Sequence, residues 1–230
     1  MKLVRLYLII SGIILLTSIG FYIWVPTFRG YLLDEDSLIE NISAILYLVS
    51  FFIGLFFFLK HERHRKALTA VSAISLLGFL DELSFGERHL GINGPLFYDV
   101  QIDGAHDFFY LAYKMALKTD FLYSIYGILL LLTGILIITA LLLKHRLKLK
   151  KLFTRIHNEA PLLFLLFFGI LIFIALIIDL GIIESKFLFM IEELFEMLAA
   201  LALLFCNLSI QAFPIFQTLS PYNANYGRKT

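Results

Sequence analysis

Residues 67–91 read ALTAVSAISLLGFLDELSFGERHLG, an apolar run that ends in a group of ionisable side chains. The apolar part, residues 67–86, is long enough to cross the hydrocarbon core of a membrane, about 30 Å, as a helix. The ionisable residues at its end are Asp81, Glu82, Glu87 and His89. We therefore predict a membrane-spanning helix that holds a polar site near one membrane surface.

The composition of the whole chain agrees with a membrane protein. Of the 230 residues, 60% are hydrophobic and 16% are charged, whereas soluble domains are nearer half apolar and a quarter charged. The single cysteine, Cys206, lies in an apolar run and provides neither a disulfide nor a cysteine zinc cluster. We predict an all-α, polytopic membrane helical bundle, with residues 1–230 forming one transmembrane domain.

Apolar segments and helix breakers divide the chain into predicted spans. The six spans are residues 3–26, 37–60, 67–86, 121–143, 161–181 and 185–213. Trp24 lies where an interfacial aromatic belt is expected, Pro161 opens the fifth span, and Pro214 follows the sixth. Residues 87–120 contain several glycines and then an amphipathic piece, 106–118, so we expect an outer interfacial helix there.

The charges predict the orientation of these spans. Most of the 19 Lys and Arg fall on the side that holds both termini and the loops 60–66 and 144–155, and most of the 18 Asp and Glu fall on the other. By the positive-inside rule both termini are cytoplasmic, in the inner or plasma membrane of the cell. The basic run 144–155 contacts anionic lipid in this interpretation, and no nucleic-acid partner is expected because aromatic residues do not interleave with its charges.

Acidic residues from four spans fall in the outer part of the membrane in this topology. They are Glu40, Asp81, Glu82, Asp179, Glu192, Glu193 and Glu196. A charge at bilayer depth costs about 2.5 kcal/mol or more near the centre, so such side chains normally face the interior of a bundle. Polar and small residues at helical spacing support a shared interior. The stripes are Glu40, Ser43, Tyr47, Ser50 and Gly54; Ser72, Ser75, Glu82, Gly86 and His89; and Glu193, Glu196, Ala200, Asn207 and Gln211.

Carboxylates and histidines together favour a divalent metal ion, zinc or similar, held without thiolates. The expected ligands are Glu82, Glu196, His106 and His89. The expected catalytic residues are Glu82, with Glu193 or Asp81 as proton acceptor, and Arg88 to hold an anionic head group. Two simpler interpretations stay open: Glu40 forms a capping box with Ser37, or the acids pair with Arg88, Lys114 and Lys186 in a structural ion-pair network.

Three functions are compatible with such a site. The first is a metal-dependent intramembrane hydrolase or transferase that acts on a lipid or lipid-linked substrate from the outer leaflet. The second is a cation- or proton-coupled transporter or channel subunit that uses Glu82, Asp179 and Glu196. The third is a non-catalytic subunit that binds a membrane-protein partner through its Phe-rich spans. A Walker-type phosphate loop and a Gly-x-Ser-x-Gly elbow are both missing from the sequence.

The segment around Glu82 also carries a resemblance. Glu82, Ser84, Phe85, Gly86 and Arg88, followed later by Ala105-His106-Asp107, resemble a group of uncharacterised bacterial multi-span membrane proteins with a Glu-x-Ser-aromatic-Gly-x-Arg core. That resemblance implies a polytopic fold and no particular activity. More weakly, the Asp81-Glu82 pair at the end of a span is similar to the alkaline-ceramidase-type membrane hydrolases, which implies zinc and hydrolysis of a lipid.

Overall fold

The computed structural model describes residues 2–33, 38–60, 65–83, 95–97, 100–101, 107–118, 133, 144, 159–180 and 185–218, with side chains in the last helix as far as 210. Its helices are α1 (Lys2–Trp24), η1 (Pro26–Phe28), α2 (Arg29–Leu33), α3 (Leu38–Lys60), α4 (Arg65–Glu82), α6 (Asp107–Lys118), α9 (Ala160–Asp179) and α10 (Lys186–Thr218). Two short strands, β1 (Leu96–Phe97) and β2 (Val100–Gln101), pair antiparallel. The described residues are therefore almost entirely helical, as predicted, apart from this small hairpin.

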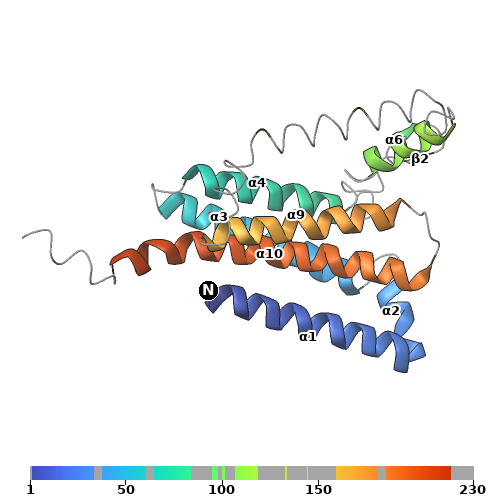
Figure 1. Cartoon of the computed structure of the whole chain (residues 1–230), viewed down its shortest axis with the longest axis horizontal. Coiled ribbons are helices and arrows are strands. Elements are labelled where there is room, and N and C mark those ends of the chain that lie inside the picture. The colour runs from blue at the N-terminus through green and yellow to red at the C-terminus, as the bar shows by residue number, and fades with distance from the viewer. Residues whose placement is uncertain are drawn as a thin grey trace, which may run out of the picture.

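Helix α10 lies at the centre of a bundle of long helices and contacts α9, α3, α4 and α1. Helices α3 and α4 also contact each other, and α1 contacts α9 as well as α10. Figure 1 shows these five helices running roughly along the same direction. The last residues of α1, α4 and α9 and the first residues of α3 and α10 lie at one end of the bundle. This alternation places the acidic ends of the predicted spans together at that end.

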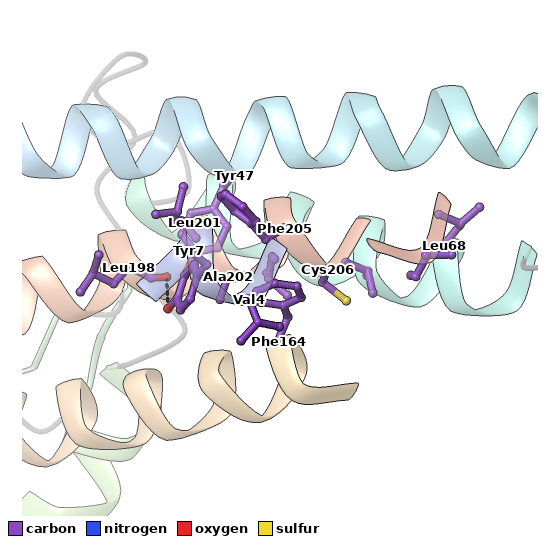
Figure 2. Packing of buried hydrophobic residues seen from close by; sticks show 14 residues of the cluster. Val4, Tyr7, Tyr47, Leu68, Phe164, Leu198, Leu201, Ala202, Phe205 and Cys206 are labelled. Atoms are coloured by element: carbon purple, nitrogen blue, oxygen red, sulfur yellow. Dashed lines mark hydrogen bonds between the residues drawn. The ribbon is translucent and has the colours of Figure 1, made fainter. Parts of the chain in front are cut away.

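Small side chains on α10 let the neighbouring helices approach closely. Ala199, Ala200 and Ala202 are fully buried, and small residues at helix contacts are the usual means of tight packing in membranes. Tyr7 of α1 packs against Phe164 and Phe205, with ring centroids 5.6 and 5.7 Å away. Its hydroxyl donates to the Leu198 carbonyl at 3.2 Å (Figure 2). The centre of the bundle is thus an aromatic and aliphatic core that joins α1, α9 and α10.

The outward faces of the long helices are apolar. Leu16 of α1, Phe52 and Phe56 of α3 and Phe173 of α9 are all more than half exposed. Among the residues that the structure describes, three helices, α1, α3 and α9, are long and apolar enough to cross a membrane. Exposed apolar side chains along these helices suit a lipid environment, so the fold suggests association with a membrane.

Most predicted boundaries agree with the helices. Helices α1, α3 and α9 begin and end within two residues of the predicted spans 3–26, 37–60 and 161–181, and α6 covers all but the first residue of the amphipathic piece. Helix α4 ends at Glu82, and the predicted continuation to residue 86 lies outside the described residues, as does nearly all of the fourth span.

The last helix is longer than the predicted span. Helix α10 continues through Pro214 to Thr218, beyond residue 213, the predicted end of the sixth span. Proline inside a helix removes one backbone hydrogen bond but keeps a helical φ, so a helix can continue beyond it with a local bend.

Candidate functional site

Five acidic side chains from three helices meet at one end of the bundle. We call Glu40, Asp81, Glu82, Glu193 and Glu196 the acidic cluster. Glu82 of α4 interacts electrostatically with Glu196 and Glu193 of α10, with Glu40 of α3 and with its neighbour Asp81. Acidic side chains from three of the predicted spans are thus close enough for their charges to act on Glu82.

The helices place these acids by their ends and by their buried faces. Glu193 lies beyond the first turn of α10 and is 7% exposed. Glu40 lies in the first turn of α3 and is 8% exposed. The N-terminus of a helix carries a partial positive charge, which favours an acidic side chain in the first turn. Asp81 and Glu82, in contrast, lie in the last turn of α4, where the dipole opposes them. A negative charge on Glu82 is therefore disfavoured both by the dipole of helix α4 and by the negative charges of the neighbouring acids.

Tyr47 of α3 lies next to the acidic cluster. The ring is buried and packs directly on Gly78, where a Cβ atom would lie 2.6 Å from the ring. Real Cβ atoms do not approach so closely, so glycine at this position is what allows the Tyr47 ring to reach α4. Tyr47 also interacts electrostatically with Glu82, Glu196 and Asp81. The phenol therefore belongs to the site.

Buried polar side chains continue inward from Tyr47 along the same three helices. We call Ser50 and Gly54 of α3, Ser72 and Ser75 of α4 and Asn207 of α10 the polar seam. The Ser50 and Ser75 hydroxyls are hydrogen-bonded at 2.9 Å. The Asn207 side-chain amide donates to the Ser50 carbonyl at 2.9 Å and to the Ser50 hydroxyl at 3.1 Å. The polar stripes predicted from helical spacing thus face one another across α3, α4 and α10.

Several predicted site residues lie elsewhere or are not described. His89, His106 and Arg88 fall outside the described residues. Asp179 and Glu192 are described, but neither is among the groups whose charges act on Glu82. Within the described ranges, no three histidine, cysteine or acidic side chains are arranged to hold a metal ion. Of the four predicted metal ligands, the structure therefore describes only the two carboxylates, Glu82 and Glu196.

Sequence reasoning placed Tyr47 on the polar stripe of α3 but gave it no role in the site. The signal that would have identified it is the pair formed by Tyr47 and Gly78, because a buried tyrosine needs a glycine opposite it to enter a tight helix contact. The contact between Tyr47 and Gly78 can be recognised only when the register of α3 against α4 is known.

Comparisons with known proteins were made for the whole chain. No family model, curated protein or solved structure matches it. The resemblance of the segment around Glu82 to other membrane proteins therefore stays a prediction.

Proposed function

We propose that this chain is a six-span protein of the cell membrane, with both termini cytoplasmic, that takes up a proton or another cation at the acidic cluster and moves it as part of transport. The supporting observation is the position of Glu82 among four other acids contributed by α3, α4 and α10. The charge asymmetry of the loops supports the orientation, with the acidic cluster towards the outer surface.

The physical reason is electrostatic. Two unit charges of the same sign about 4 Å apart repel each other by about 4 kcal/mol at an effective dielectric constant near 20. Carboxylates that share a partly buried site therefore favour the entry of a positive charge, such as a proton on one carboxyl. Acidic side chains at membrane depth commonly mark ion and proton routes for this reason.

The test of this function is transport by the whole protein in sealed lipid vesicles. The purified chain is reconstituted with a pH-sensitive dye inside, and proton entry is followed after a membrane potential is applied. Entry of Na⁺, K⁺, Ca²⁺ and Mn²⁺ is followed in parallel. Flux of one of these ions above that of protein-free vesicles supports the proposal, and no flux of any of them, from folded protein, contradicts it.

A metal-dependent hydrolase or transferase that acts on an outer-leaflet lipid is the second candidate. It is favoured by the place of Asp81 and Glu82 in the last turn of α4, directly before the segment that contains Arg88 and His89. This function predicts a stoichiometric divalent metal in the purified protein, reduced in the Glu82→Ala, Glu196→Ala and His106→Ala variants. Elemental analysis of the four proteins, each checked by thermal melting, decides it: metal-free, folded wild type rejects this candidate and leaves the transport proposal standing.

A further inference from the structure

Tyr47 lies between the two polar groups of the bundle interior. On α3, Tyr47 follows Glu40 of the acidic cluster by seven residues and precedes Ser50 of the polar seam by three, and all three side chains are buried. Its contact on α4, Gly78, lies four residues before Glu82, about 6 Å along the helix axis. Tyr47 and Gly78 therefore mark the level at which the acidic cluster ends and the polar seam begins.

The ring of Tyr47 fills the space between three helices at this level. A Cβ atom at Gly78 would lie 2.8, 2.6 and 2.8 Å from the Cδ1, Cε1 and Cζ atoms of the ring, so the ring rests directly on the backbone of α4. Tyr47 is 3% exposed and belongs to one buried cluster with Leu201 and Phe205 of α10 (Figure 2). The ring is thus an apolar layer between two polar ones.

The exposure of the polar side chains changes at the same level. Three members of the acidic cluster are only half-buried: Asp81, Glu82 and Glu196. The side chains of the polar seam next to Tyr47 are 0% exposed and are hydrogen-bonded to one another: Ser50, Ser75 and Asn207. Part of the acidic cluster is therefore open to the surroundings, whereas the seam beyond the Tyr47 ring is closed.

We propose that the Tyr47 ring is a barrier at the inner side of the acidic cluster, which leaves the cluster open towards the outer surface and separates it from the polar seam. Apolar constrictions stop ions because water leaves them and ring carbons provide no oxygen in its place. A cation taken up at the cluster passes inward only when the ring leaves Gly78. The inference rests on the proposed transport function for its cargo, whereas the barrier itself rests on the packing of Tyr47.

A single cysteine placed beyond the ring tests the barrier. Ser50→Cys is made together with Cys206→Ala, which removes the one native cysteine, and the whole chain in lipid vesicles is treated with a small cationic methanethiosulfonate. We expect slow modification with Tyr47 in place. Modification should be faster by about tenfold or more with Tyr47→Ala, because truncation opens the way to residue 50. Tyr47→Phe keeps the ring and should react as slowly as its Tyr47 parent.

Phe205→Ala is the matched control, since it truncates a buried ring of the same cluster that packs against Tyr7 and Phe164. It should leave residue 50 slow to react. Slow modification in folded Tyr47→Ala overturns the barrier, and so does equally fast modification in folded Phe205→Ala or Tyr47→Phe. If Tyr47→Ala does not fold, Tyr47→Leu takes its place, because leucine is too short to cover α4 at this level.

The charge of the reagent tests the way in. An anionic methanethiosulfonate should modify residue 50 of the Tyr47→Ala chain more slowly than the cationic one, because the carboxylates of the acidic cluster attract cations and repel anions. Equal rates for the two reagents overturn entry through the acidic cluster.

Ion flux separates the barrier from the proposed function. Tyr47→Ala in the otherwise native chain should let the transported ion enter reconstituted vesicles faster by about tenfold or more, since the barrier is removed. Unchanged flux in this folded variant overturns the barrier and leaves the transport function intact. Absence of flux of any ion, from folded wild type and folded Tyr47→Ala, overturns the transport function, and the cysteine at residue 50 then decides the barrier alone.

Discussion

Glu82→Gln is expected to abolish ion entry into reconstituted vesicles, down to the level of protein-free vesicles. Glutamine keeps the size of the side chain, so the packing at the end of α4 is retained. It has no ionisable carboxyl, however, and therefore neither takes up a proton nor balances the charge of a cation. Glu82 is the acid on which the charges of Glu196, Glu193, Glu40 and Asp81 all act, so its loss removes the centre of the acidic cluster.

The matched control for this variant is Glu159→Gln. Glu159 precedes the first residue of α9, at the opposite end of the bundle from the acidic cluster (Figure 1). Both substitutions remove one negative charge, so an effect of net charge on reconstitution would appear in both. Equal flux in Glu82→Gln and wild type, or equal loss in Glu82→Gln and Glu159→Gln, contradicts a specific role for Glu82.

Phe164→Ala is expected to give the largest loss of stability among single substitutions in the core. Phe164 is fully buried and its ring lies 5.6 Å from Tyr7 and 5.7 Å from Phe205, so it joins α9 to α1 and α10 (Figure 2). Truncating such a ring removes its packing contacts and leaves a cavity, at a cost of about 3–5 kcal/mol. Thermal melting in detergent should show a midpoint lower by about 6 °C or more.

Phe173→Ala provides the comparison on the same helix. Phe173 is 64% exposed on α9 and faces the surroundings of the bundle. Its truncation removes the same atoms without opening a cavity in the core, so the change in stability should stay within about 0.5 kcal/mol. Similar destabilisation by the two variants would mean that α9 is not packed against α1 and α10 as described.

The helical fold was predictable because each long helix is a continuous apolar segment with a recognisable boundary. Lys60 and Pro161, for example, mark the end of α3 and the start of α9. The stripe from Glu40 to Gly54 was predictable for a related reason: polar residues that recur at the helical period share one face, and that face is buried. Helix α10 continues past Pro214, since a single proline bends a helix without necessarily ending it.

The contacts between helices were not predictable from periodicity. Helical spacing places Tyr47 on a polar stripe, but its direct contact with Gly78 depends on the vertical register of α3 against α4. The same holds for the approach of Ser72 and Asn207 to Gly54. Asp179 was grouped with the other acids by its predicted depth in the membrane, and its charge is not among those that act on Glu82.

The most direct test of the acidic cluster is the infrared spectrum of its carboxyl groups in reconstituted wild type and Glu82→Gln at neutral pH, together with the metal content of both proteins. The proposed uptake of a cation predicts that wild type contains either a protonated carboxylic acid, seen by its C=O stretch, or a bound cation, and that the variant loses that signal. A wild-type protein that is folded, free of metal and without any protonated carboxyl band would contradict a cation-binding acidic cluster.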